Sequence, residues 1–348
     1  MILVSLRDLQ FRRRRFVVAI AGTSVVLALT LVLAGVSSSF VNEARRSTQA
    51  LHAQSWVVPE GSSGPFMSSA TLPASLAADL QARTGAPAAP LVVLRSSVVV
   101  HGATEEINVL GVPVGSFAEP PLRDGRFPRG SGEVTVDDLL GPRVGDTLSI
   151  AGTEVVVVGR THGLSYRANV PSIYVPLADA QALGYGGADL ASAIVTSAAV
   201  DRVGPGFTIL RDADVEKDLL GPLESPRQTI QMVLGILWLV AVMIVGSVVY
   251  LSALDRVRDF AVFKAMGADD RSVLSGLVVQ SLLLSGIAYL IGSALSRVLA
   301  PLLPMQAEIS GFTYVVLAGV AFLVAVLSSL AAVRRALSID PALAFGGA

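Results

Sequence analysis

The sequence predicts a membrane α-helical protein with four transmembrane helices and a large extracytoplasmic mixed α/β domain inserted between helices 1 and 2. Hydrophobic residues make up 52% of the 348 residues and charged residues only 15%, which is too apolar for a soluble chain of this length. Four uncharged stretches are each long enough to cross about 30 Å of hydrocarbon. The segment between the first two stretches is polar, with short alternating apolar runs, which is typical of a folded domain.

The N-terminal residues 1–15, MILVSLRDLQFRRRR, predict a cytoplasmic interfacial helix that ends in four arginines. Residues 16–40 follow as transmembrane helix 1. A secretory signal is the alternative, because a basic segment precedes the apolar one and small residues at Ala34 and Gly35 resemble a cleavage site. The length of the apolar run, and the three spans after it, favour a retained anchor.

Residues 41–227 predict the extracytoplasmic α/β domain with stalk helices, the first of them expected near residues 42–54. The chain has no cysteine, so this domain must be stable without disulfides, and thiolate metal sites and a cysteine nucleophile are excluded. The expected helices are 76–83 and 177–183, and the expected strands are 56–59, 91–101, 107–112, 134–136, 147–150, 154–159, 172–175, 193–196 and 207–210.

The C-terminal third predicts the other three spans and their connections. Several arginines follow the second and fourth spans, whereas the connection after the third contains a single basic residue, Arg297. Because basic residues are enriched in cytoplasmic loops, both termini are expected in the cytoplasm of a plasma or inner membrane protein. The predicted segments are transmembrane helices 228–254, 272–296 and 309–333, a cytoplasmic segment 255–271, an external loop 297–308 and a cytoplasmic tail 334–348.

Two polar groups in the large domain raise the question of a binding site. Asp212, Asp214, Glu216 and Asp218 alternate as in part of a calcium loop, but the glycine and the distal acid of that loop are missing. A solvated helix start is therefore favoured. His162, beside Tyr166 and Arg167, raises the possibility of a ligand surface, but an exposed loop is favoured.

The chain itself is not predicted to be an enzyme. The spans hold no Asp, Glu, Lys, Arg or His, so neither an ion relay nor a Ser-His pair is available within the membrane. No G-x-x-x-x-G-K-[ST] segment is present, so ATP must be hydrolysed by a separate protein. The balanced charge gives no indication of nucleic-acid binding.

The segment RVRDFAVFKAMG, between the second and third spans, is short, charged and amphipathic. It resembles the cytoplasmic coupling segment of the FtsX-like, MacB-type permeases of ABC transporters, whose pattern reads roughly E-R-x-R-E-I-G-I-x-K-A-L-G-A. The C-terminal RRALSIDPALAF is similar to the closing pattern of the same family. The resemblance implies ATPase-coupling residues Arg256, Arg258, Asp259, Phe260, Phe263, Lys264, Met266 and Gly267, and tail contacts Asp340 and Pro341.

The resemblance, in particular to the actinobacterial FtsX-like permeases, also implies the partners and the function. These are a homodimer of this chain in the lipid bilayer and two copies of an ABC ATPase, which bind the ATP and Mg²⁺, so that no cofactor is expected in this chain. ATP hydrolysis would move the extracytoplasmic domain and export or extract a substrate by mechanotransmission. The alternatives are an FtsX-type regulator of an extracytoplasmic cell-wall hydrolase, and small-solute transport, for example of amino acids.

Overall fold

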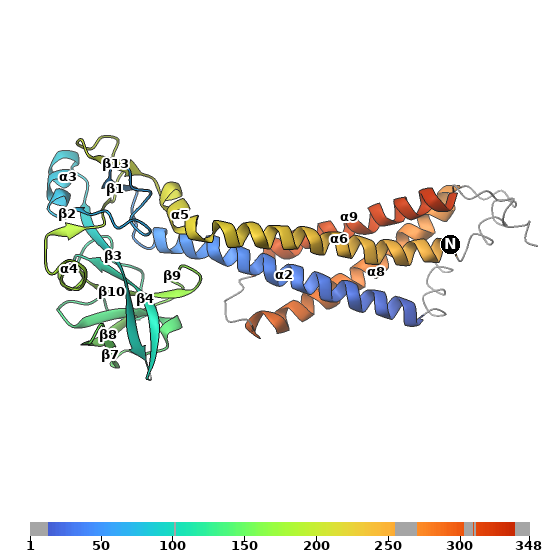
Figure 1. The fold of residues 1–348 in the computed structure, drawn as a ribbon, viewed down its shortest axis with the longest axis horizontal. Coiled ribbons are helices and arrows are strands. Elements are labelled where there is room, and N and C mark those ends of the chain that lie inside the picture. Colours follow the sequence, from blue (N-terminus) through green and yellow to red (C-terminus); the bar gives the residue numbers. More distant parts are fainter. Residues whose placement is uncertain (1–12, 101, 255–269, 303–308, 310, 338–348) are drawn as a thin grey trace, which may run out of the picture. The chain divides into compact units, whose positions relative to one another are not determined.

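The fold is that of a computed structural model, which describes residues 13–100, 102–254, 270–302, 309 and 311–337 (Figure 1). The chain divides into two compact units. Met1–Ser39 and Pro226–Ala348 form a helical unit, and Phe40–Ser225 form a second unit, the sheet domain. The predicted boundaries of the large domain, 41–227, differ from the observed ones by one or two residues at each end.

Four long helices overlap the four predicted spans, and the fourth begins at Gly311 rather than at 309. Among the described residues, three segments are long and apolar enough to cross a membrane: Phe16–Gln49, Asp212–Val248 and Ser281–Leu302. A shorter apolar segment, Gly311–Leu327, lies in the fourth helix. The bounds are α2 Arg13–Gln49, α6 Glu224–Leu254, α8 Asp270–Leu299 with a 3₁₀ turn η3 Ala300–Leu302, and α9 Gly311–Leu337.

The helical unit is held by apolar contacts among these helices. Phe16 and Ala19 of α2 pack with Val245 of α6 and Leu284 of α8 in one buried cluster. At Gly292 of α8 the backbone approaches α2 so closely that a Cβ atom would lie 2.8 Å from the Ser24 carbonyl oxygen. Such close approach through a small residue is the usual way in which membrane helices gain van der Waals contact.

The sheet domain contains a strand at each of the nine places where the alternating pattern predicts one. Its helices are α3 Leu76–Thr84, α4 Leu177–Tyr185 and α5 Asp212–Leu220, with 3₁₀ turns η1 Asp138–Leu140 and η2 Gly221–Leu223. Its strands are β1 Ser55–Pro59, β2 Leu72–Pro73, β3 Ala88–Val100, β4 Ala103–Val112, β5 Asp124–Gly125, β6 Glu133–Asp137, β7 Thr147–Ile150, β8 Thr153–Thr161, β9 Ser165–Tyr166, β10 Val170–Pro176, β11 Leu190–Ala191, β12 Ala193–Thr196 and β13 Phe207–Leu210.

Eleven of these strands form one sheet in the order β13-β1-β12-β3-β4-β10-β6-β8-β5, with β7 paired to β3 and β8, and β9 paired to β10. The long β3–β4 hairpin is antiparallel, whereas β10 runs parallel to β4. The connection between β7 and β8 is a two-residue turn in which Ala151 and Gly152 have φ values of 47° and 84°. Positive φ at both positions matches the turn type that right-twisted hairpins prefer.

Both faces of the sheet are buried, which explains why neighbouring strand residues alternate between two cores. Val57 and Ile173 point into one core, which α3 and α4 cover through residues such as Leu80. Trp56 and Tyr174 point into the other core. That second face is covered by the last turns of α2, by Leu51 just after it, and by α5, through Ala44, Val215 and Leu219.

Candidate functional site

The ATPase-coupling residues predicted from the sequence lie outside the described residues, as do both tail residues. They are Arg256, Arg258, Asp259, Phe260, Phe263, Lys264, Met266, Gly267, Asp340 and Pro341. The candidate site that the structure does describe is in the sheet domain, on the face covered by α2 and α5. Two joints attach these helices to the sheet, and each is built around a buried carboxylate.

The α2 joint consists of Glu43 and Ser47, on the last turns of α2, and of the segment Leu164–Asn169. The Asn169 backbone N–H donates to Glu43 Oε2 at 3.1 Å, and Ser47 Oγ donates to the Ser165 carbonyl oxygen at 3.1 Å. Glu43 is only 8% exposed and Ser47 only 1%. A charge-assisted hydrogen bond in such a buried place is about twice as strong as a neutral one. The helix is therefore bound firmly to the tip of the β9–β10 hairpin.

The loop at this tip has an unusual backbone. Arg167, Ala168 and Asn169 have φ values of 61°, 61° and 76°, so three consecutive residues other than glycine are left-handed. Each such residue costs on the order of 1–3 kcal/mol and persists only where the surroundings enforce it. Here the Glu43 carboxylate fixes one end of the loop, and the Asn108 side chain donates to the Val170 carbonyl oxygen at 3.0 Å.

The other end of this hairpin is fixed to the sheet by Asp137. Its carboxylate accepts from the Leu164 N–H at 2.7 Å, the Leu139 N–H at 3.1 Å and the Thr161 hydroxyl at 3.2 Å. Burial raises the pKa of Asp137, although the two backbone N–H groups and the Thr161 hydroxyl oppose that shift. The hairpin is thus hydrogen-bonded to the sheet on one side and to α2 on the other.

The α5 joint consists of Asp218 and the loop Ser62–Met67. Asp218 is 6% exposed, and its carboxylate accepts from the Ser63 hydroxyl at 2.7 Å and from the backbone N–H groups of Phe66 and Met67 at 3.1 and 3.2 Å. A Cβ atom at Gly64 would lie 2.4 Å from Asp218 Oδ2, so the loop can lie this close only with glycine there. The prediction of a solvated acidic helix start is therefore wrong for Asp218.

Aromatic side chains connect the two joints. The rings of Trp56 and Phe66 have centroids 5.9 Å apart, and those of Phe66 and Tyr166 lie 5.1 Å apart in an edge-to-face arrangement. The Trp56 indole N–H donates to Asp212 Oδ1 at 2.8 Å. Tyr166 is 2% exposed and burial raises its pKa, so the prediction of an exposed loop is wrong at this residue.

A direct ion pair between the two helices adds little. Arg45 of α2 and Glu216 of α5 lie 3.9 Å apart, and the arginine side chain is 55% exposed. Exposed pairs of this kind contribute about 0–1 kcal/mol. The connection between α2 and α5 therefore runs through the hairpin and the aromatic rings rather than through this pair.

The chemistry of both joints is that of attachment. The Glu43 carboxylate accepts from a backbone N–H, and that of Asp218 from two backbone N–H groups and a hydroxyl. Among the described residues no group of His, Cys, Asp or Glu side chains could hold a metal ion. Such an arrangement can hold a helix against a sheet and pass a displacement from one to the other. Glu43 and Asn169 could not be predicted from the sequence, since the two residues lie more than 100 positions apart along the chain.

A protein-family model matches part of the helical unit, and relatives of similar length match the whole chain. The family described as FtsX-like permease C-terminal matches residues 232–341. Uncharacterized ABC transporter permeases of Mycobacterium bovis and of Mycobacterium tuberculosis H37Rv are each 38% identical over 351 residues, with 100% of both chains covered. A second permease of M. tuberculosis H37Rv is 34% identical over 348 residues, again with 100% of both chains covered.

Two solved structures are similar to part of the chain. The extracellular domain of the noncanonic ABC-type transporter YknZ, from Gram-positive bacteria, is 12% identical with a TM-score of 0.35, covering 46% of this chain and 99% of that one. The periplasmic region of MacB from Actinobacillus actinomycetemcomitans is 13% identical with a TM-score of 0.36, covering 49% and 94%. These TM-scores are too low to assign the fold of the sheet domain, which is described by its own strand order. The full-length relatives decide the family, and the chain belongs to the FtsX-like permeases of ABC transporters.

Proposed function

We propose that this permease couples ATP hydrolysis by a separate ATPase to movement of its sheet domain, outside the cytoplasm, and so exports or extracts a substrate by mechanotransmission. The observation that carries the proposal is the α2 joint. One helix, α2, runs from Arg13 to Gln49, and its last turns are hydrogen-bonded to a strained hairpin of the sheet domain. A shift of α2 would therefore act directly on the sheet.

The remaining parts of the proposal follow from the sequence and the family. The chain forms a homodimer with two ATPase subunits, crosses the membrane four times and has both termini in the cytoplasm. The ATPases bind ATP and Mg²⁺ and dock on residues 255–271 through Phe260, Phe263 and their charged neighbours. Uncharged spans and a large domain held by two carboxylate joints favour force transmission over passage of a small polar solute through the helices.

The first test removes the contact with the ATPase. Phe263→Asp should abolish co-purification of the ATPase, because burying a lone carboxylate in an apolar groove costs several kcal/mol. At about 1.4 kcal/mol per tenfold, that loss moves a micromolar contact beyond millimolar. Lys264→Arg is the matched control and should retain the ATPase. Wild-type stoichiometry and activity with Phe263→Asp would show that this segment is not the coupling helix.

The second test leaves the ATPase bound and breaks the α2 joint. Glu43→Ala removes the acceptor of the Asn169 N–H, which is worth about 1.5–3 kcal/mol for a charged partner. Spin labels at Ala78→Cys, in a chain that has no other cysteine, report the distance between the two sheet domains of the complex. ATP should change that distance in the wild type and change it much less in Glu43→Ala.

Glu60→Ala, at an exposed position of the same domain, is the control for this second test and should behave as the wild type. Equal ATP-driven distance changes in Glu43→Ala and in the wild type would contradict transmission through the α2 joint. Absence of any ATP-driven change in the wild type, with the ATPase bound and active, would contradict the proposed function itself.

A further inference from the structure

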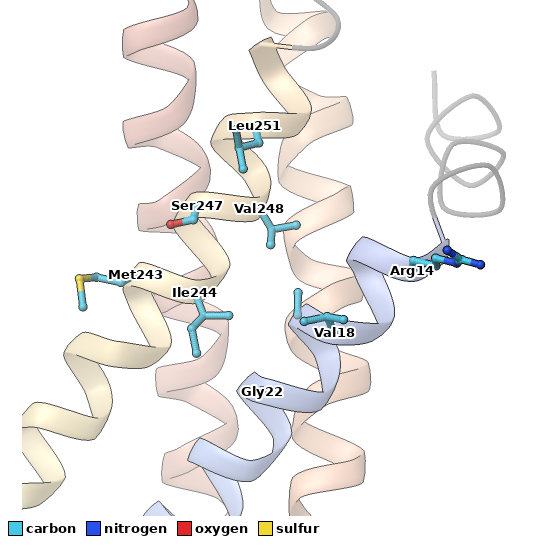
Figure 2. A pocket seen from close by; sticks show the side chains of 9 residues that line it. Arg14, Val18, Gly22, Met243, Ile244, Ser247, Val248 and Leu251 are labelled. Atoms are coloured by element: carbon cyan, nitrogen blue, oxygen red, sulfur yellow. The ribbon is translucent and has the colours of Figure 1, made fainter.

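The helical unit contains an apolar groove between α2 and α6 with a volume of about 750 Å³. Its walls are Val18, Ala19 and Gly22 of α2 and a stretch of α6 from Met243 to Leu251. Figure 2 shows Val18 and Gly22 on one side and Ile244 and Val248 on the other, with Arg14 beyond Val18 toward the N-terminal end of α2. Apart from the Ser247 hydroxyl, the groove therefore has apolar walls, and it has one cationic end.

The groove begins where the two helices separate. A Cβ atom at Gly22 would lie 3.8 Å from Ile244 Cδ1, so α2 and α6 are in van der Waals contact at that level. Ala19 and Val248 are 4% and 9% exposed and form the floor. Val18, Met243 and Leu251 are 71%, 54% and 46% exposed and form the rims. Rims this apolar are stable only against lipid or another apolar surface.

The charge at the end of the groove selects the occupant. Arg14 is exposed and forms no ion pair with any residue that the structure describes. In the sequence it belongs to a run of four arginines, Arg12–Arg15, directly before the apolar span. Basic residues at the end of a membrane helix attract anionic headgroups, and basic pockets between such helices bind them.

From this arrangement we infer that the groove binds one anionic phospholipid, with an acyl chain between α2 and α6 and the phosphate at Arg14. The lipid comes from the leaflet at the N-terminal end of α2. A second copy of this chain fits less well, because a two-fold axis along the membrane normal brings the arginines of both copies to the same depth. Like charges there repel, whereas a phosphate neutralises them.

The experiment measures lipid association with the full-length protein in nanodiscs, using spin-labelled phosphatidylglycerol and phosphatidylcholine. The wild type should immobilise phosphatidylglycerol in preference to phosphatidylcholine. Arg14→Gln should reduce that preference by about fivefold, since each basic residue near the surface contributes roughly that factor. It should leave the immobilisation of phosphatidylcholine unchanged, because the hydrocarbon walls are intact.

A second variant fills the groove without altering its charge. Met243→Trp should reduce the immobilised fraction of both lipids. Met232→Trp should not, since Met232 is also well exposed on α6, at 64% against 54%, but does not line the groove. The inference is overturned if the wild type has no preference for phosphatidylglycerol, or if Arg14→Gln retains the full preference. It is also overturned if Met243→Trp leaves lipid immobilisation unchanged and instead dissociates a dimer, which would make the second copy the occupant.

Discussion

The α5 joint and the α2 joint hold helices against the same face of one sheet, but they differ in how much strain they hold. At the α5 joint, Asp218 accepts three hydrogen bonds from a loop that a glycine lets lie close. At the α2 joint, Glu43 binds the end of a loop with three left-handed residues. The loop of the first joint, residues 62–67, has no residue with positive φ, whereas the loop of the second has three. If the sheet domain moves as proposed, we expect the α5 joint to be the fixed one and the α2 joint the adjustable one.

The largest effect should come from breaking the fixed joint. Asp218→Ala leaves the Phe66 and Met67 N–H groups and the Ser63 hydroxyl without their acceptor. The Ser63 hydroxyl can bond to water instead, because Ser63 is exposed. At about 1–3 kcal/mol for each of the two N–H groups left unsatisfied, we expect the free energy of unfolding of the sheet domain to fall by about 2–4 kcal/mol. Fluorescence of Trp56, in a Trp238→Phe background that leaves it the only tryptophan, reports the transition in the full chain.

Lys217→Ala is the matched control for this prediction, because Lys217 is the neighbour of Asp218 and its side chain is 77% exposed. It should change the free energy of unfolding by less than about 0.5 kcal/mol. If Asp218→Ala were as mild as Lys217→Ala, the α5 joint would not be the fixed one.

A smaller effect, of opposite sign, is expected at the adjustable joint. Ala168 has a φ of 61°, and glycine tolerates that conformation without the clash of a Cβ atom. Ala168→Gly should therefore stabilise the sheet domain by about 0.5–1 kcal/mol in the same fluorescence assay. Because the strain that favours rearrangement is relieved, the ATP-driven distance change should decrease.

Ala151→Gly separates these two consequences. Ala151 also has positive φ, 47°, but lies in the β7–β8 turn and not in either joint. It should stabilise the domain similarly and leave the distance change as in the wild type. If both glycine variants changed the movement equally, strain at the hairpin would have no special role.

The smallest effect concerns a restraint outside both joints. Glu133 accepts from Arg126 Nη1 at 2.7 Å and from the Arg129 N–H at 2.9 Å, and these hydrogen bonds lower the pKa of Glu133 to about 2 from 4.5. A lowered pKa means that the stabilisation is complete above about pH 4.5 and is lost as the pH falls toward 2. Glu133→Gln should therefore weaken the acid dependence of unfolding in that window, and Glu154→Gln, at an exposed position, should not.

The helices and strands could be predicted well from the sequence, whereas the contacts of the α2 and α5 joints could not. Strands such as 147–150, 193–196 and 207–210 have the same bounds in the structure, because alternation and turn residues are local signals. The order of the strands, with β10 between β4 and β6, depends on contacts far apart in the sequence. The burial of Asp218 likewise depends on partners about 150 positions away. From its charge alone, the residue was predicted to be exposed to solvent.

The left-handed backbone of the β9–β10 hairpin also could not be predicted from the sequence. Of Arg167, Ala168 and Asn169, only asparagine favours positive φ, and neither alanine nor arginine signals it. The groove at Arg14 could be predicted only in part. The arginine run and the apolar spans are plain in the sequence. The separation of α2 from α6 beyond Gly22 could not be predicted, because it depends on how two helices more than 200 positions apart cross.

The strand pairing around the hairpin has a mechanical consequence. β10 is paired over five residues with β4 and also with β6, so a pull along β10 loads many hydrogen bonds at once, in shear. β9 is paired with β10 at only two positions, and a pull on its end breaks these one after the other, as in unzipping. Under load, the hairpin would yield before the sheet does. The strength of the hairpin would therefore set the largest force that α2 can impose on the sheet domain.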